Sequence, residues 1–68
     1  MKNSDRELVI QTALSQYRLA VYSGKPEKLA YALNEMENVE LMCSPWGTKG
    51  IGQLRKAIKE ARQRLALK

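Results

Sequence analysis

The stretch that decides the fold is Gly50–Lys68, GIGQLRKAIKEARQRLALK, in a sequence of 68 residues. Its apolar residues recur at spacings of three and four, the pattern of an amphipathic helix packed against other helices. They are Ile51, Leu54, Ile58, Ala61 and Leu65. We therefore expect a helix over about residues 50–67 that is buried along one narrow side.

The same stretch holds most of the positive charge of the chain. From Cys43 onward there are seven basic residues and one acidic residue, whereas the preceding residues include five basic and six acidic ones. One interpretation is a solvated face whose cations oppose the helix macrodipole. The other is a contact face for an anionic partner, nucleic acid above all. The nucleic-acid-binding candidates are Lys49, Arg55, Lys56, Lys59, Arg62 and Arg64.

Two further helices are expected before this one. Ser4 and Glu7 have the spacing of a capping box, and Gly24 is suited to the left-handed residue that ends a helix, which predicts a first helix over residues 4–23. Its core face should comprise Ile10, Ala13, Leu14, Tyr17, Ala20 and Val21.

Pro26 at a first helical position predicts a second helix over residues 26–41, joined to the first by a sharp turn. Its core face should comprise Leu29, Ala32, Leu33, Met36 and Val39. Residues 42–49, with Pro45 and glycine as helix breakers, are expected to form a loop. The second helix is also acidic, so Glu35, Glu37 and Glu40 could neutralise part of the basic helix within one chain or across a dimer.

The fold class that follows is all-α. We expect one domain over residues 1–68, a compact three-helix bundle made of a helical hairpin and the C-terminal amphipathic helix. A chain of this length lies near the lower limit at which a domain buries enough apolar surface to fold alone. Association of two chains would supply further burial.

Three large apolar residues of the first helix, Leu8, Leu19 and Tyr22, lie on the side opposite its core face. Isolated exposed apolar residues are ordinary, but three on a second stripe indicate that the helix is covered on both sides. The cover would come from neighbours within the chain or from a second subunit. This stripe is the main reason to expect a homodimer.

Trp46 is the only tryptophan and lies in the expected loop. The favoured interpretation is that it closes the open end of a small helical core. The alternative is an anchor for a protein partner, because tryptophan is enriched at binding hot spots. The protein-binding candidates are therefore Leu8, Leu19, Tyr22 and Trp46.

Enzymatic chemistry has little support in this composition. There is no histidine, and Cys43 is the only cysteine, so a zinc site and a disulfide framework are not expected. Catalysis would need paired carboxylates, a lysine or a tyrosine, and the acids fall on exposed helical positions. We expect no enzymatic activity, no catalytic residue, no metal and no cofactor, with Cys43 as a small buried residue.

Motifs for phosphate and DNA are also weak. Residues 47–52 lack the spacing and the preceding strand that a P-loop requires. The amides that open the third helix, together with Lys49, are a lesser candidate for holding one backbone phosphate. The connection between the last two helices is too long for a helix-turn-helix. Nucleic-acid binding would therefore depend on the basic helix, for instance on two such helices paired across phosphates.

The chain resembles small helical accessory proteins encoded in the early regions of temperate, lambda-like bacteriophages in its short capped start Met1–Leu8, its hairpin at Lys25–Glu27 and its basic tail Gln53–Lys68. The resemblance implies a host-modulating or regulatory protein that works by binding, often as a homodimer, inside a bacterial cell. It assigns a role to no particular residue.

No apolar run approaches the roughly 18 residues that span a bilayer, and the polar N-terminus lacks the core of a signal peptide. A cytoplasmic protein is expected, in the host bacterium if the chain is phage-encoded. The first hypothesis is a small non-enzymatic module that binds a protein partner, and the alternative is a nucleic-acid-binding regulator. A third, weaker hypothesis is a toxin-like peptide that acts at a membrane through its C-terminal helix.

Overall fold

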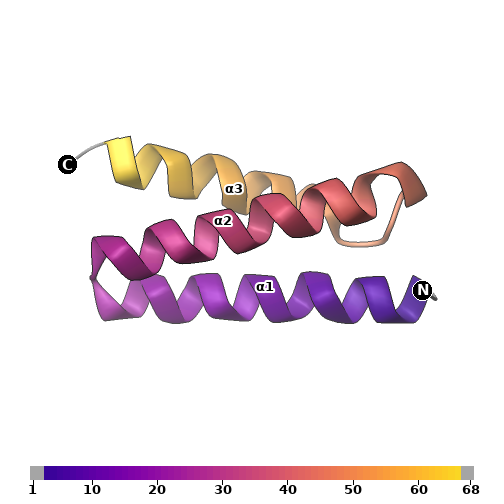
Figure 1. Cartoon of the computed structure of the whole chain (residues 1–68), viewed down its shortest axis with the longest axis horizontal. Coiled ribbons are helices and arrows are strands. Elements are labelled where there is room, and N and C mark those ends of the chain that lie inside the picture. The colour runs from indigo at the N-terminus through magenta and orange to yellow at the C-terminus, as the bar shows by residue number, and fades with distance from the viewer. Residues whose placement is uncertain (1–2, 67–68) are drawn as a thin grey trace.

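The computed structural model describes residues 3–66 and has three helices, α1 (Asn3–Ser23), α2 (Pro26–Cys43) and α3 (Ile51–Ala66). A short 3-10 turn, η1 (Ser44–Trp46), follows α2 directly. No strand occurs within the described residues. Figure 1 shows the three helices running alongside one another, so the expected all-α three-helix bundle is confirmed.

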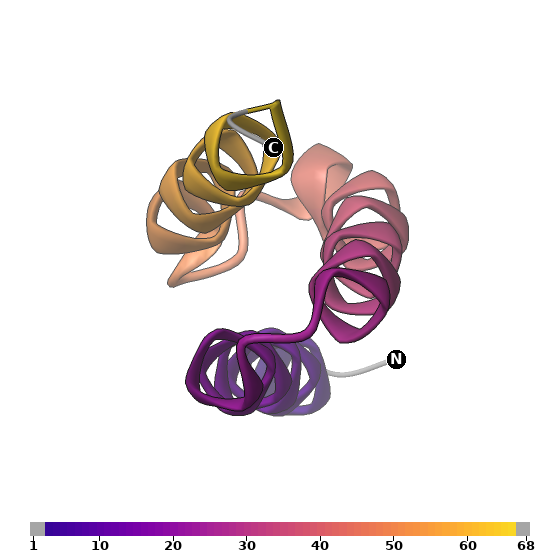
Figure 2. The same cartoon turned by 90° about the vertical axis from the view of Figure 1, so that its left-hand side faces the viewer.

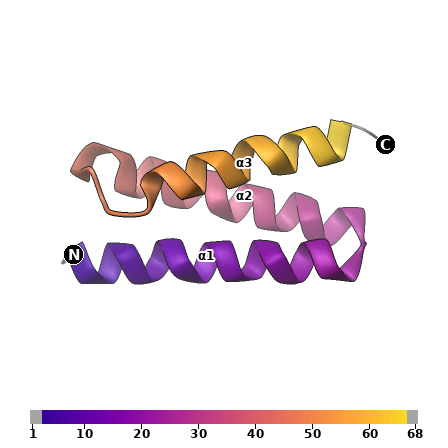
Figure 3. The same ribbon diagram turned by 180° about the vertical axis from the view of Figure 1, so that it is seen from behind.

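The central helix of the bundle is α2. It packs along α1 on one side and along α3 on the other, while α1 and α3 contact each other less extensively. The view along the bundle in Figure 2 places the three helices at the corners of a triangle, with α2 joined to both neighbours. Figure 3 shows from behind that α3 lies against α2 and runs antiparallel to it. The resulting bundle measures 37 × 17 × 14 Å.

The core faces follow the predicted periodicity closely. Val21, Leu33, Ile51 and Leu65 were expected inside and are partly buried against the core. Ala57 is buried although it lies off the predicted stripe, because it comes three residues after Leu54 and four before Ala61 and so lies beside both on the helix. The buried apolar residues are Ile10, Ala13, Leu14, Tyr17, Ala20, Leu29, Ala32, Met36, Val39, Cys43, Leu54, Ala57, Ile58 and Ala61.

The helix ends differ slightly from the expected ones. The first helix begins at Asn3 rather than at Ser4, and the predicted capping box depends on the Ser4 side chain, which lies outside the described side chains. The third helix begins at Ile51 and ends at Ala66, and residue 67 of its predicted range also lies outside the described residues.

The turn between α1 and α2 is set by Gly24. Its φ of 68° is left-handed, as expected for the residue after a helix, and its amide donates to the carbonyl of Val21 over 3.2 Å. The Ser23 hydroxyl donates to the carbonyl of Ala20 and accepts the amide of Lys25. Pro26 then opens α2 without leaving an amide unsatisfied. The short turn makes α1 and α2 an antiparallel hairpin.

The expected loop over residues 42–49 is wrong in its first half. Met42 and Cys43 continue α2, and Pro45 lies inside the 3-10 turn instead of in an open loop. The physical reason is that Cys43 lies four residues after Val39 on the core face and is fully buried, so extending the helix buries one more side chain. The connection is then closed by Thr48, whose buried hydroxyl donates to the carbonyl of Cys43 over 3.3 Å.

Two glycines with different backbone conformations give a matched stability test. An alanine at Gly24 would meet no neighbouring atom but would adopt a left-handed φ, so Gly24→Ala should lower the free energy of unfolding by about 1 kcal/mol. Gly52 is helical, exposed and free of close neighbours, so Gly52→Ala should raise that free energy by about 0.5 kcal/mol. Urea unfolding followed by circular dichroism measures both. A loss of stability in both variants would contradict the assigned helix boundaries.

Candidate functional site

The basic side of α3 is largely engaged with the acidic side of α2. Arg55 Nε donates to Glu40 Oε2 over 3.1 Å, and Arg55 Nη2 donates to the Ser44 hydroxyl over 2.7 Å. Further along the same interface, Arg62 pairs with Glu37. The predicted neutralisation of the basic helix by the acidic one is thus confirmed within one chain for Glu37 and Glu40.

A second group of charges connects α1 to α3. The Tyr17 hydroxyl donates to Glu60 Oε1 over 2.6 Å, and Arg64 Nε donates to the same oxygen over 3.2 Å. Burial, followed by the hydrogen bond to Glu60, raises the pKa of Tyr17. The hydrogen bonds from Tyr17 and then from Arg64 lower the pKa of Glu60. Glu60 therefore serves as a structural acceptor between two helices.

Three of the six nucleic-acid-binding candidates form no ion pair with a described residue, namely Lys49, Lys56 and Lys59. All three are exposed, and Lys56 and Lys59 are three residues apart on the outer side of α3. Lys49 lines a groove of 520 Å³ between the start of α3 and α1. Glu7 lines the same groove, and its carboxylate would repel a phosphate held by the helix amides and Lys49, the lesser candidate site of the sequence.

Trp46 does not close the core, and that interpretation is wrong. Its side chain is 62% exposed, because η1 turns it outward while Cys43 and Thr48 fill the end of the bundle. The guanidinium of Arg6 lies over the indole, 4.2 Å from the ring centroid. Arg6 itself is only 8% exposed, so the cation is held firmly beneath one face of the ring. The other interpretation, an exposed anchor, is compatible with this geometry.

The second stripe of α1 is exposed in the isolated chain. Leu8 and Leu19 are each more than 60% exposed and Tyr22 is 89% exposed, so neighbours within the chain do not cover them. Leu8 and Tyr22 are about 21 Å apart along the helix axis, given a rise of 1.5 Å per residue. They therefore form no single compact patch.

The structure adds exposed apolar residues of α2 that the sequence reasoning did not identify. Among the described residues, every exposed large hydrophobic side chain belongs to α1, α2 or η1, and none belongs to α3. The complete set is Leu8, Leu19, Tyr22, Tyr31, Leu41, Met42 and Trp46. The signal for Tyr31 and Leu41 was available, since both fall outside the predicted core stripe of α2, as Leu19 does on α1, whereas Met42 was placed in the expected loop.

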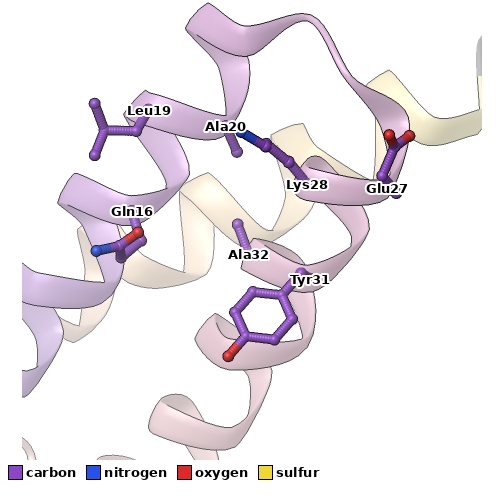
Figure 4. Close-up of a pocket in the computed structure, with 7 residues that line it drawn as sticks. All are labelled: Gln16, Leu19, Ala20, Glu27, Lys28, Tyr31 and Ala32. Atoms are coloured by element: carbon purple, nitrogen blue, oxygen red, sulfur yellow. The ribbon is translucent and has the colours of Figure 1, made fainter.

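Two of these residues, Leu19 and Tyr31, line a groove of 380 Å³ between α1 and α2, close to the hairpin turn. Figure 4 shows Leu19 on α1 and Tyr31 on α2 at the two sides of this groove. Ala20 and Ala32 form its floor, because both are buried. Its polar lining comes from Gln16, Glu27 and Lys28.

The protein-binding candidates are thus divided between the two ends of the bundle. Leu19 and Tyr22 lie near the end of α1, at the hairpin turn, and Tyr31 near the start of α2 lines the same groove as Leu19, whereas Leu8 lies near the start of α1 and Trp46 follows the end of α2. Figure 1 shows that the start of α1 and the end of α2 lie at the end of the bundle opposite the hairpin turn. Trp46 is brought beside Arg6, a residue forty positions earlier in the chain. No local sequence pattern could have indicated that contact.

Other kinds of site have no counterpart in the described residues. These residues contain no group of three or more His, Cys, Asp or Glu side chains that could hold a metal ion, and Cys43 is a buried free thiol. No helix within residues 3–66 is long and apolar enough to cross a membrane. No protein-family model, curated protein sequence or solved structure matches the chain.

The Tyr17–Glu60 hydrogen bond predicts a pH-dependent effect of Tyr17→Phe. At pH 7 the variant should lose about 1 kcal/mol of unfolding free energy. Because the pKa of Glu60 is lowered in the folded state, its contribution is present above its unfolded value of about 4.3 and is lost as pH falls through the folded value. The difference between the two proteins should therefore shrink at pH 3.

The pKa of Tyr17 is raised in the folded state, so its contribution is present below an unfolded value of about 10 and is lost as pH rises through the folded value. The difference should then also shrink in strong base. Urea unfolding across this pH range measures it, with Tyr22→Phe as the control because Tyr22 is exposed. An equal loss at pH 3 and pH 7 would show that the hydroxyl and the carboxylate are not coupled.

Proposed function

We propose that this protein is a non-enzymatic interaction module that binds a protein partner through its α1–α2 hairpin and the adjoining η1 turn. The observation that carries the proposal is the segregation of exposed apolar side chains. Seven large ones lie on α1, α2 and η1, and none on the described part of α3. They form one group near the hairpin turn and another near η1, and exposed apolar side chains that gather on a protein surface are typical of binding sites.

The central anchor in this proposal is Trp46. Its indole presents one face to solvent while Arg6 holds the other, so little side-chain freedom remains to be lost on binding. An aromatic side chain oriented in this way fits an apolar pocket on a partner, which is the common geometry of a hot spot. Met42, half-exposed on the preceding turn of α2, would contribute further apolar area at this end.

Nucleic-acid binding is the second candidate, and the structure offers it less support. Arg55, Arg62 and Arg64 already contact carboxylates, so a phosphate would have to compete with Glu40, Glu37 and Glu60. Lys56 and Lys59 are the remaining cations on the outer side of α3. A regulatory accessory role inside a bacterial cell, of the kind that the phage resemblance implies, requires only the protein-binding surface.

Trp46→Ala tests the protein-binding proposal. The variant should fold normally, because the side chain is exposed, but it should lose affinity for a captured partner by about 30-fold, equivalent to about 2 kcal/mol. The immobilised protein is incubated with bacterial extract, captured proteins are identified by mass spectrometry, and their affinity is then measured by calorimetry. Lys59→Ala, an exposed change on α3, is the control. Equal binding by Trp46→Ala and the original chain would contradict the proposal.

Fluorescence anisotropy with duplex DNA at about 50 and 200 mM salt separates the two candidates. A protein making several phosphate contacts binds at the lower salt and weakens steeply at the higher one. We expect no such steep binding. Binding that disappears in a Lys56→Glu, Lys59→Glu double variant and survives in Trp46→Ala would replace protein binding with nucleic-acid binding.

A further inference from the structure

One stripe of α2 has an order of charges that suits a second copy of the chain. Lys28, Tyr31 and Glu35 are spaced by three and four residues and so lie on the same side of the helix. Lys28 and Tyr31 line the groove that Leu19 bounds from α1 (Figure 4). Lys28 is exposed and Glu35 is partly exposed, and neither forms an ion pair with a described residue.

This stripe is self-complementary under a two-fold rotation. Lys28 and Glu35 are separated by about 10 Å along the helix axis, given a rise of 1.5 Å per residue. Tyr31 lies close to the midpoint between them. A two-fold axis that passes beside Tyr31 at right angles to α2 therefore exchanges the positions of the cation and the anion. Such an isologous contact is the commonest arrangement in homodimers.

We propose that the groove beside Tyr31 is occupied by a second copy of this chain, with the two α2 helices antiparallel. Lys28 would contact the partner subunit's Glu35, and the symmetry would repeat that pair on the other side of the axis. Tyr31 of the partner subunit would fill the groove beside Leu19 and Tyr31, at the apolar centre between the two ion pairs. The order of polar, aromatic and polar residues gives the apolar centre and charged rim of a stable interface.

A second copy is favoured over an unrelated helix because the two-fold rotation places the cation of each copy opposite the anion of the other. An unrelated partner or a lipid surface would not require a cation and an anion at equal distances from one aromatic side chain. This surface lies near the start of α2, at the hairpin end, whereas Trp46 follows the end of α2, at the opposite end of the bundle (Figure 1). The proposal extends the α1–α2 binding face of the proposed function, but it does not depend on Trp46 binding anything.

Charge reversal followed by mixing tests this arrangement. The original chain should form a dimer of twice 7.7 kDa in sedimentation velocity at micromolar concentration and low salt. Lys28→Glu alone and Glu35→Lys alone each place like charges opposite each other twice per dimer. Each should raise the dimer dissociation constant by at least about tenfold.

An equimolar mixture of the two single variants should restore association, because every contact in the mixed dimer then joins opposite charges. General attraction does not explain such a rescue, since the variants carry net charges of +3 and +7 against +5 for the original chain. The double variant Lys28→Glu, Glu35→Lys should also form a dimer. Lys59→Glu changes the net charge as Lys28→Glu does, but on α3, and should leave the dimer intact.

Leu19→Ser and Tyr31→Ser test the apolar centre and should each yield monomer with an unchanged circular dichroism spectrum, because both side chains are exposed in the isolated chain. A monomeric original chain at several hundred micromolar would overturn the proposal. So would a mixture of the two charge variants that stays monomeric. Partner capture that is undiminished in Trp46→Ala while the dimer is intact would contradict the proposed function and leave this inference standing, so the failure of each proposal can be recognised separately.

Discussion

The packing of α2 against both of its neighbours is the constraint on which the rest of the structure depends. Its buried residues recur every three or four positions from Leu29 to Cys43, so one face of the helix fills the space between α1 and α3. Because α1 and α3 contact each other less, the bundle has no alternative centre. The side of α2 near α3 carries the ion pairs, and the side near α1 borders the apolar groove.

That arrangement separates two kinds of surface on a very small protein. The excess positive charge of α3 is partly compensated by Glu37 and Glu40, which lie across the interface and are themselves partly exposed. Exposed pairs of this kind contribute only about 0–1 kcal/mol each, so their main effect is to direct the arginine side chains along the bundle. The exposed large apolar side chains lie on α1, α2 and η1, and none lies on the described part of α3, which carries the excess positive charge.

The fold could be predicted from the sequence because its determinants are local. Apolar spacing identified the three helices, and Gly24 with Pro26 located the first turn. The end of α2 was predicted too early because Pro45 was taken as the signal, although Cys43 still continues the core periodicity. The site was harder to predict, since the orientation of Trp46 depends on Arg6, forty residues earlier, and pairing over such a distance leaves no mark in a single sequence. The groove at Leu19 and Tyr31 likewise exists only once two helices are placed side by side.

The burial of Cys43 provides a way to observe local opening of the bundle. Its thiol is fully buried where α2 meets η1, and the Thr48 hydroxyl donates a hydrogen bond to the carbonyl of Cys43. A thiol reagent can reach the sulfur only when this end of the bundle separates. The alkylation rate of the single cysteine therefore reports how often this end of the folded bundle opens. The measurement needs no added label.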